Sequence, residues 1–370
     1  MYPQITTNCG PAEWRNESTQ KPPKQAVSLH DAGAAAILDQ ARQDTAVIWR
    51  GDFHNAKQVL AALKKRLRAK RPSEKNDLTP AERFHRHRMR QAQQSRTVNM
   101  LAVEIGAGFR PELPRAPDVR AALADVYGEE NDTPFLLPLN QLLGFVGAHE
   151  WHKKGVDIPS LGGRIHVPFG VFSPLRGEYL DLLMRAELPP SFQTAFDIGT
   201  GSGVLAALLA KRGLRQITAT DNNPRALSCA GDNIRRLGLQ RQIGIEAADL
   251  FPEGCADLIV CNPPWLPAKP TSAVETALYD PDHAILRGFL NGARSHLNGG
   301  GEVWLIMSDL AEHLGLRAAD FLPRCFQTAG LSLIETLHIR PQHGKAVSTD
   351  DPLAFARNRE TTSLYRLKAE

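Results

Sequence analysis

Four consecutive residues in the second half of the chain have the types needed to hold a planar nitrogen group. They are Asn262, Pro263, Pro264 and Trp265. An amine or amide nitrogen conjugated to a ring or a carbonyl has a delocalised lone pair that must be oriented before it reacts. The Asn262 side-chain oxygen and the Pro263 carbonyl oxygen can each accept one of its N–H bonds, and the prolines keep both in place. Trp265 can stack on the group, although two prolines can also simply end a strand.

A glycine-rich turn precedes this loop in the chain. It is the segment DIGTGSG, residues 197–203, between an apolar segment and a helical one. Glycines at a strand-to-helix turn let the backbone approach a ligand and expose amide N–H groups at a helix N-terminus. The Asp197 carboxylate would repel a dinucleotide phosphate but suits the amino group of a sulfonium nucleoside. The turn therefore predicts S-adenosylmethionine as the cofactor, with contacts from Asp197, Gly199, Thr200, Gly201 and Gly203.

Polar residues follow the next two apolar segments as well. Asp221 ends the segment ITATD, where a carboxylate can accept both ribose hydroxyls, and Asn222 is assigned to the same contact. Asp249 lies in AADLF and can accept the adenine amino group, with Leu250 or Phe251 beside the ring. A single acid at such a place also serves as a helix cap or a loop residue. Three acids and a glycine turn in this order predict one cofactor site at the carboxyl ends of parallel strands.

Together these motifs resemble those of class I S-adenosylmethionine-dependent methyltransferases with an Asn-Pro-Pro-aromatic signature. The matching segments are DIGTGSG, ITATDNNP, AADLF and LIVCNPPW, within about residues 165–315. The group includes release-factor glutamine methyltransferases, ribosomal RNA guanine-N2 methyltransferases and adenine-N6 methyltransferases. The resemblance implies a Rossmann-like, doubly wound, seven-stranded α/β sheet. It also implies that the three acids and Asn262 face the cofactor and that the residues from Asn262 to Trp265 face the substrate nitrogen.

Two further segments bear on this resemblance. VFSPLRGEY, residues 171–179, stands where the group has a motif that covers the cofactor, which assigns Phe172 to the cofactor site. Release-factor enzymes have an Arg-Pro-acid-Thr-Glu pattern there, which this chain lacks. ETALYDPDHAILRGFL, residues 275–290, is similar to the release-factor segment that follows the catalytic loop.

The motifs must be positioned by an alternation of strands and helices. We predict strands at residues 194–198, 217–220, 243–247, 257–261 and 302–307, and helices at residues 203–212, 224–237 and 283–297. Strands that alternate with helices of this length predict a parallel doubly wound sheet. We expect a poorly ordered tail over residues 1–28, a mainly helical, basic substrate-recognition domain over 29–160 and the catalytic domain over 161–370.

The charge of the chain is unevenly distributed. The net charge of the 370 residues is +4, yet twelve Lys or Arg stand against three acidic residues between Lys64 and Arg96. Such asymmetry predicts an anionic partner, or alternatively a solvated helix face. The candidate contacts to RNA phosphates are Lys64, Lys65, Arg66 and Arg68.

The remaining composition narrows the class of protein. The five cysteines are scattered, so the sequence predicts neither a metal site nor an iron–sulfur cluster. The apolar segments are too short to span a bilayer and the first residues do not form a secretory signal. We therefore expect a cytoplasmic protein without metal or membrane contact.

Two substrates fit the chemistry of the Asn262 loop. The leading interpretation is N-methylation of a nucleobase amino group in RNA, with ribosomal RNA as the expected substrate, because of the basic segment. The alternative is N5-methylation of a glutamine in a protein partner, because a carboxamide presents a similar planar NH2 group. A non-catalytic binding module would not need Asn262 and the intact glycine turn.

Overall fold

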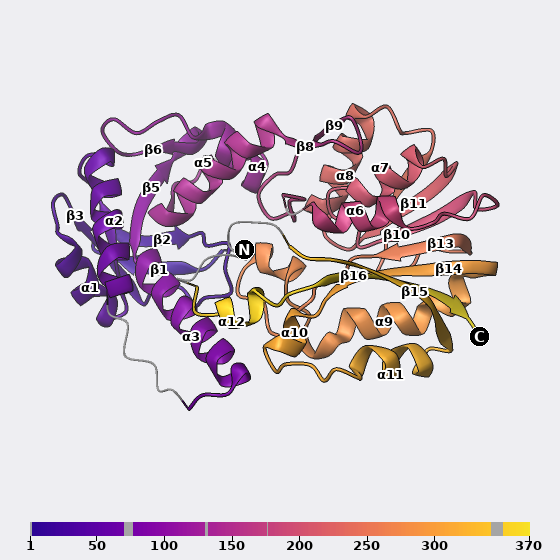
Figure 1. Ribbon diagram of the computed structural model, residues 1–370. Coiled ribbons are helices and arrows are strands. Elements are labelled where there is room, and N and C mark those ends of the chain that lie inside the picture. The colour runs from indigo at the N-terminus through magenta and orange to yellow at the C-terminus, as the bar shows by residue number, and fades with distance from the viewer. Residues whose placement is uncertain (1, 70–76, 130–131, 176, 342–350) are drawn as a thin grey trace. The chain divides into compact units, whose positions relative to one another are not determined.

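The computed structural model describes residues 2–69, 77–129, 132–175, 177–341 and 351–370 (Figure 1). The chain divides into two compact units. The amino-terminal unit comprises Met1–Leu78 and His85–Glu150, and the carboxy-terminal unit comprises Thr79–Phe84 and Trp151–Glu370. Residues 70–76 of the basic segment and Arg176 lie outside the described residues.

The carboxy-terminal unit contains a seven-stranded sheet in the order β12-β11-β10-β13-β14-β16-β15. The strands are β10 (Thr194–Ile198), β11 (Gln216–Asp221), β12 (Ile243–Ala247), β13 (Ala256–Cys261), β14 (Leu297–Ser308), β15 (Leu331–Ile339) and β16 (Thr362–Ala369). β10 to β14 pair in parallel, while β16 is antiparallel to both of its neighbours. The expected doubly wound α/β sheet is confirmed. Two short strands, β8 (Val156–Ile158) and β9 (Gly163–Ile165), form a separate antiparallel pair.

Helices cover both faces of this sheet (Figure 1). One face carries α6 (Glu178–Arg185), α7 (Val204–Lys211) and α8 (Pro224–Arg236), and the other carries α9 (Ala284–Ala293) and α11 (Phe321–Thr328). The side chains of β13 alternate accordingly. Leu258 and Val260 pack in the core cluster that contains α6, α7 and α8, whereas Ile259 and Cys261 pack in the cluster that contains α9 and α11. The central, parallel part of the sheet is therefore buried on both faces.

Smaller elements complete this unit. They are the helices α10 (Leu310–His313) and α12 (Ala354–Arg357) and the 3-10 helices η2 (Ala273–Ala277), η3 (Pro281–His283) and η4 (Arg294–His296). The start of α8 follows local sequence rules, because the Asn223 side chain accepts the Arg225 N–H and Pro224 occupies the first turn.

The register of the strands fixes where the sequence motifs meet. Ile198 of β10 lies opposite Cys261 of β13 and opposite Thr220 of β11. Gly199 and Asn262 therefore leave the sheet next to each other. The chain runs outward from β10 in one direction and from β13 in the other, which is the switch point where open α/β sheets bind ligands.

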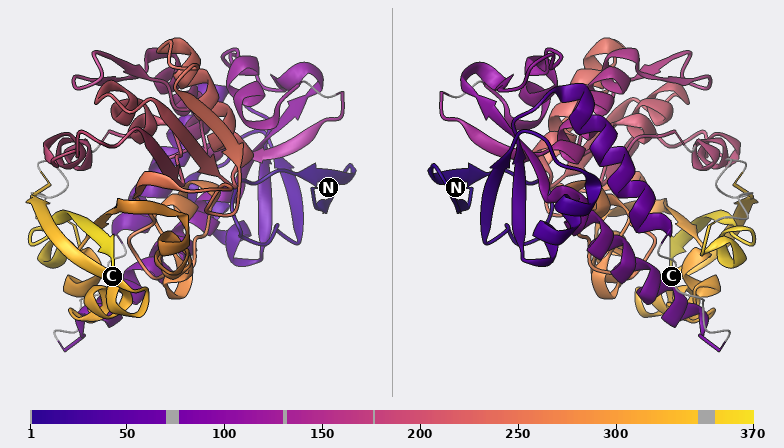
Figure 2. Two further views of the ribbon diagram at one scale, coloured as in Figure 1. Left: turned by 90° about the vertical axis from the view of Figure 1, so that its right-hand side faces the viewer. Right: turned by 90° about the vertical axis from the view of Figure 1, so that its left-hand side faces the viewer.

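The amino-terminal unit also contains a seven-stranded sheet, in the order β4-β3-β1-β2-β7-β5-β6, and its curved strands are visible in indigo and purple in Figure 2. An additional pairing of β4 with β5 closes it on itself. The strands are β1 (Gln4–Thr7), β2 (Gly10–Trp14), β3 (Gln25–Leu29), β4 (Thr45–Trp49), β5 (Leu101–Gly106), β6 (Arg110–Pro111) and β7 (Phe135–Pro138). One core cluster draws residues from every strand of the ring, among them Ile5, Trp14, Ile48 and Leu136.

Two expectations for this unit need correction. The predicted tail over residues 1–28 is wrong, because β1, β2 and most of β3 lie there and pair within the sheet. A mainly helical domain was expected, and its helices are present, but they accompany a sheet that was not predicted. The helices are α1 (Ala34–Arg42), α2 (Phe53–Ala69), α3 (Pro80–Asn99), α4 (Arg120–Tyr127), α5 (Leu139–Lys154) and the 3-10 helix η1 (Ala107–Phe109). Strands of four or five residues paired across long sequence separations leave little local signal.

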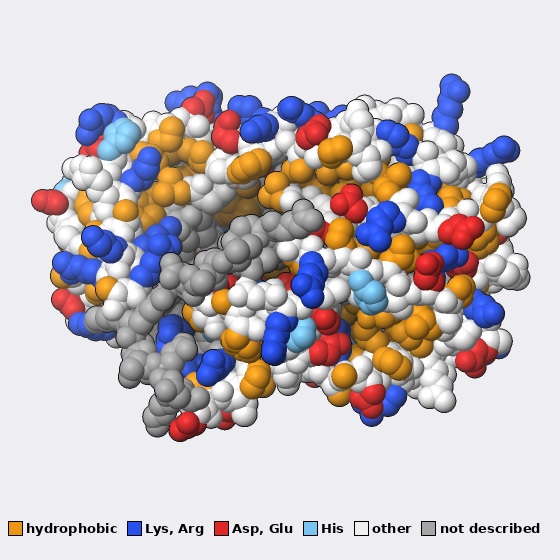
Figure 3. All heavy atoms as spheres, viewed as in Figure 1, with side chains coloured by type: hydrophobic (Ala, Val, Ile, Leu, Met, Phe, Trp, Pro, Cys, Tyr) orange, Lys and Arg blue, Asp and Glu red, His pale blue; other side chains and the backbone are white. Residues whose placement is uncertain are grey.

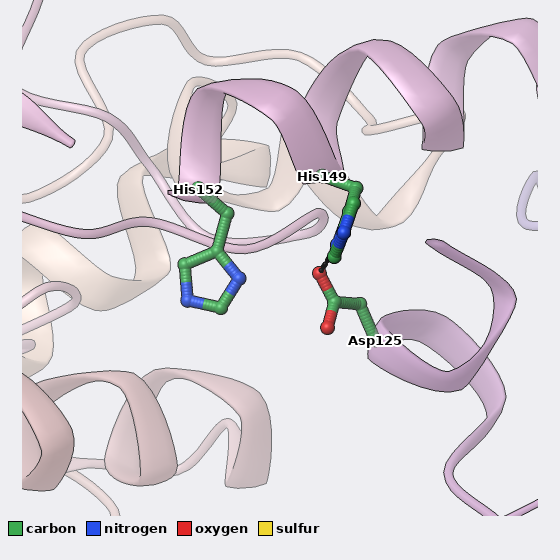
Figure 4. Close-up of side chains that lie close together, drawn as sticks. All are labelled: Asp125, His149 and His152. Atoms are coloured by element: carbon green, nitrogen blue, oxygen red, sulfur yellow. Dashed lines mark hydrogen bonds and ion pairs between the residues drawn. The ribbon is translucent and has the colours of Figure 1, made fainter. Parts of the chain in front are cut away.

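A polar contact joins the last two helices of this unit. His149 of α5 and Asp125 of α4 approach to 2.8 Å between Nδ1 and Oδ2, and Figure 4 shows the pair with His152 one turn further along α5. The division between the units falls within α5, after Glu150, rather than at the expected residue 160.

Candidate active site

The glycine turn after β10 is open on the side where a ligand would lie. Gly199 and Gly201 have φ angles of 69° and 55°, in the left-handed region that favours glycine. A Cβ built on either residue meets no atom within 4 Å. These glycines are therefore needed for backbone conformation and ligand access, and not for packing. Thr200 between them is buried, and its N–H donates to the Thr220 carbonyl at 2.8 Å, which ties the turn to β11.

Asp197 lies under this turn and is fully buried. Its Oδ2 accepts hydrogen bonds from Thr200 Oγ1 at 2.6 Å and from the Ala206 N–H at 3.0 Å. Its Oδ1 is buried without a partner among the described residues. Burial raises the pKa of this carboxyl to about 6. An unpaired buried acceptor beside an open glycine turn fits a ligand that brings its own N–H or water donor, as the amino group of S-adenosylmethionine does.

Asp221 ends β11 and holds the glycine turn from its other side. One carboxylate oxygen, Oδ2, accepts the Gly201 N–H at 3.0 Å, and the other accepts the Asn223 N–H at 2.9 Å. Each oxygen keeps a further lone pair, so the group can still accept a ribose hydroxyl. Asn222, the expected second contact, is exposed at the start of the following loop.

The segment after β12 contains the residues expected to contact adenine. Asp249 is exposed, and Leu250 has a φ of 77°, a strained conformation for a leucine. The Leu250 carbonyl accepts the Thr220 hydroxyl at 2.6 Å, which holds this conformation in place. Strain of this kind is typical of ligand-binding loops.

Phe251, one of the two expected ring contacts, packs against other side chains of the domain. Its ring stacks on Phe289 and His296, with centroid distances of 5.8 and 4.3 Å. It also lies directly against α9, where a Cβ built on Gly292 would come within 2.6 Å of its Cε2 atom. Leu250 remains as the apolar candidate. The sequence pattern did not distinguish the two neighbours, because their sides were set by packing against α9.

The segment before β10 contributes Phe172 and a residue that sequence reasoning missed. Phe172 is half-buried and packs against the core cluster that contains α6, α7 and α8. Tyr179 at the start of α6 is buried, and burial together with the nearby Asp197 charge raises its pKa. This segment therefore ends in a buried aromatic hydroxyl within the influence of the Asp197 charge. The only sequence signal was its place at the end of VFSPLRGEY.

The Asn-Pro-Pro-Trp loop follows β13 as expected. Pro263 and Pro264 are buried, and Asn262 and Trp265 are half-buried. The Trp265 indole Nε1 donates to Asn262 Oδ1 at 2.9 Å. The Trp265 ring packs against the core clusters of both sheet faces. The residue expected to stack on substrate thus also contacts the predicted catalytic amide.

The segment of residues 275–290 supports this loop. The Leu266 N–H donates to the Leu278 carbonyl at 3.2 Å, and the Asp280 N–H donates to the Leu266 carbonyl at 2.9 Å. The buried Asp280 carboxylate in turn accepts the N–H groups of Ile285 and Leu286, both at 3.0 Å, at the start of α9. Sequence reasoning noted the segment but not Asp280, which connects the loop to α9.

The carboxylates converge at the end of β13. Cys261, the residue before Asn262, is buried, and burial raises its pKa well above the usual value. The negative charges of Asp197, Asp280 and Asp221 raise it further, in that order. The thiol is therefore not a nucleophile at neutral pH. An acidic environment of this kind suits a ligand with a positive sulfonium and a protonated amine.

The basic candidates lie on the amino-terminal unit. Lys64 of α2 is half-buried, and burial followed by the nearby Arg68 charge lowers its pKa. Lys65, Arg66 and Arg68 are exposed. Gln94 of α3 donates to the Leu67 carbonyl at 3.2 Å, which sets the basic end of α2 beside α3. Figure 3 shows Lys and Arg side chains over these helices and also across the rest of the face in view.

This strand order, with a glycine turn after β10 and Asn-Pro-Pro-Trp after β13, defines the fold and site of a class I S-adenosylmethionine-dependent methyltransferase. Comparison with known families agrees. Residues 163–330 match the model of the methyltransferase small domain family. The carboxy-terminal unit is therefore similar to that family over these residues, and its methyl donor is S-adenosylmethionine.

Individual relatives are similar over the same region. The release factor glutamine methyltransferase of Cereibacter sphaeroides is 34% identical over 164 residues, which are 38% of this chain and 59% of that protein. The ribosomal protein uL3 glutamine methyltransferase of Neisseria gonorrhoeae is 42% identical over 129 residues, 34% of this chain and 42% of that protein. The chain thus spans about half the length of these relatives. The solved ribosomal protein L11 methylase of Lactobacillus delbrueckii subsp. bulgaricus aligns with a TM-score of 0.38 and 19% identity, over 56% of this chain and 86% of that one.

In the part of the chain that the structure describes, no helix combines the length and the apolar character needed to cross a membrane.

Proposed function

We propose that this protein methylates the side-chain nitrogen of a glutamine in a protein partner. The observation that carries the proposal is the Asn-Pro-Pro-Trp loop beside the glycine turn, set by the opposition of Ile198 and Cys261. Relatives named as glutamine methyltransferases of release factors and of ribosomal protein uL3 support it. The sequence of residues 275–290, which includes Asp280, also favours it, because it resembles the segment that follows the catalytic loop in release-factor enzymes.

The residues of the loop have separate tasks in this reaction. When bound, S-adenosylmethionine supplies an electrophilic methyl group. Asn262 Oδ1 and the Pro263 carbonyl each accept one N–H of the carboxamide and turn its lone pair toward that group. Transfer of that methyl group would form a nitrogen–carbon bond at the expense of the donor's carbon–sulfur bond, and the methylated nitrogen would then release one proton to solvent. No general base is required, because the proton becomes acidic only after transfer.

A second candidate is the expected methylation of a nucleobase amino group in RNA. The basic end of α2 favours it, since phosphate contacts give affinity independent of sequence. The relatives named above do not favour it, because both are named for protein substrates. The loop chemistry serves either acceptor, so the two proposals differ only in what is methylated.

The test is transfer of tritiated methyl from S-adenosylmethionine into a lysate of a strain that lacks this protein. Ribonuclease and protease are applied to separate portions after labelling. We expect the label to survive ribonuclease and to be released by protease, followed by its recovery as N5-methylglutamine after enzymatic digestion. Label lost with ribonuclease alone would overturn the glutamine proposal in favour of RNA. The Asn262→Ala protein provides the background.

A further inference from the structure

We infer that Trp265 is a positioning residue, whose indole N–H fixes the orientation of the Asn262 amide so that its oxygen meets the acceptor nitrogen. In terms of activity, this inference rests on the proposed methylation of a planar nitrogen. The geometry is the 2.9 Å hydrogen bond from Trp265 Nε1 to Asn262 Oδ1.

The need for such a residue follows from the chemistry of asparagine. A half-turn about the last side-chain torsion exchanges the oxygen and the NH2 group of Asn262, and only the oxygen can accept an N–H bond. If the NH2 group faced the substrate, donors would meet donors. An indole N–H is a donor only, so Trp265 can pair with the oxygen and not with the NH2 group. It therefore selects the productive orientation.

The second lone pair of the oxygen remains for the substrate. A carbonyl-type oxygen has two lone pairs, and Trp265 occupies one of them. In the described part of the chain, the indole is the only hydrogen-bond partner recorded for the Asn262 side chain. The orientation of the amide thus depends on this one contact.

The indole itself is held by its surroundings. Its ring packs against the core clusters on both faces of the sheet, at the edge where they meet. It stands between the buried Pro264 and the half-buried Leu266, and two backbone hydrogen bonds fix Leu266 to the support segment. The donor is therefore in place before any substrate arrives, and substrate binding does not have to supply the energy of ordering it.

The first test replaces the donor and keeps an aromatic ring. Trp265→Phe retains apolar packing but has no N–H group. Initial rates of tritium transfer are measured against lysate concentration, which gives an apparent maximal rate and a half-saturation point. We expect the maximal rate to fall about tenfold, as for loss of one well-placed hydrogen bond, with little change in half-saturation. Cofactor affinity by calorimetry and the melting temperature show whether the fold is intact.

A double-mutant cycle separates orientation from packing. The carboxylate introduced by Asn262→Asp has two equivalent oxygens, so it has no wrong orientation to be corrected. Trp265→Phe should therefore lower the maximal rate about tenfold in the protein that retains Asn262. It should hardly change the maximal rate of the Asn262→Asp protein. Equal losses in both backgrounds would show that the ring only fills space, and would overturn the inference.

A spectroscopic measurement covers the case in which Asn262→Asp has no measurable activity. In protein labelled with ¹⁵N at the indole, the signal missing from Trp265→Phe identifies Trp265. Asn262→Ala should move that signal toward the position of an unbonded indole. The signals of Trp49, bonded to the Asp52 carbonyl, and Trp304, bonded to Glu302, should stay in place as internal controls. An unmoved Trp265 signal would refute the contact.

The two proposals fail in different ways. Label found in RNA would remove the glutamine proposal and leave the cycle and the indole signal readable. An additive cycle with label in protein would remove the role of Trp265 and leave the glutamine proposal standing.

Discussion

The molecule contains two seven-stranded sheets. The candidate catalytic and cofactor residues lie at the carboxyl ends of the parallel strands of one of them. In the carboxy-terminal unit the sheet is open and its inner strands run in parallel. The loops that follow β10, β11, β12 and β13 therefore lie together at the carboxyl ends of these strands, which we call the open edge. In the amino-terminal unit the pairing of β4 with β5 closes the sheet, and its core cluster fills the ring. The candidate partner contacts of that unit lie on the helix α2 instead.

The difference follows from strand direction and order, not from strand number. The chain leaves β10 in one direction and β13 in the other, which makes the ends of these two strands a switch point where open α/β sheets bind ligands. A closed sheet has no such point, because each ring strand has a neighbour on both sides. Substitutions at the open edge should therefore change reaction and cofactor binding, and substitutions on α2 should change only partner binding.

The largest effect is expected from Asn262→Ala. Removal of the side-chain acceptor should lower the rate of methyl transfer by about a hundredfold to a thousandfold, as with other preorganised hydrogen-bonding groups. Cofactor affinity measured by calorimetry should stay close to normal. Unchanged turnover would show that the Asn262 side chain does not hold the reacting nitrogen.

The next effect is on stability and concerns Asp197. Its folded pKa of about 6 exceeds the ordinary 3.8, so the unfolded chain releases this proton first as the pH rises. The free energy of unfolding should therefore fall between about pH 4 and pH 6. Asp197→Asn removes that component and should be more stable at pH 7 by on the order of 2 kcal/mol, while binding the cofactor more weakly.

Urea unfolding of the wild-type and Asp197→Asn chains at pH 4.5 and pH 7 measures this effect. The Asn oxygen can still accept from Thr200 and Ala206, which keeps the local hydrogen bonds. If the free energy of unfolding depended on pH equally in both chains, ionisation of Asp197 would not destabilise the folded state.

Asp221→Ala tests the part of the open edge assigned to the cofactor. Loss of the carboxylate frees the Gly201 N–H and removes the ribose acceptor, so the cofactor Kd should rise about tenfold. Calorimetry with S-adenosylmethionine measures it. Asp232→Ala on the outer side of α8, whose exposed ion pair with Arg235 lies in the same unit, is the control and should leave the Kd unchanged.

The smallest effect is expected from substitutions in the amino-terminal unit. Replacement of Lys64, Lys65, Arg66 and Arg68 by Gln should weaken RNA binding and flatten its dependence on salt by up to about three log units per log unit of salt. Fluorescence anisotropy with a single-stranded oligonucleotide at several salt concentrations measures it. The matched control replaces four exposed basic residues of the other unit, Lys211, Arg215, Arg236 and Arg241. An equal loss in both proteins would assign the effect to net charge.

The open-edge unit was largely predictable from its sequence. The strands expected at 194–198 and 243–247 match β10 and β12 to the residue. β10 is a short, mostly buried apolar run, and β12 is an edge strand between a helix and a loop, of which only Ile243 is buried. The helix expected at 283–297 ends as α9 at Ala293 and continues as η4. The three acids assigned to the cofactor lie at or near the ends of their strands, with Asp197 in β10, Asp221 at the end of β11 and Asp249 after β12, since each position depends on local pattern alone.

What the sequence did not predict depends on contacts between distant segments. β1 and β2 contain mostly polar or half-exposed residues, and their place became clear only from pairing with β3 and β7. The link from Asp280 to the catalytic loop needs a register between Leu266 and Tyr279 that no local pattern gives. The bond between Trp265 and Asn262 requires a particular loop path, whereas the sequence indicated only their types.

The close approach of Phe251 to α9 limits how this domain can be engineered for heat resistance. Exchanging glycine for alanine within a helix usually adds about 1 kcal/mol of stability. At Gly292 the new methyl group would meet a ring already enclosed by Phe289 and His296, and that ring cannot move aside. α9 therefore has a glycine, a weak helix former, at the position where the loop after β12 packs against it. Consensus-style improvement of α9 would therefore displace the loop that carries Asp249 and Leu250.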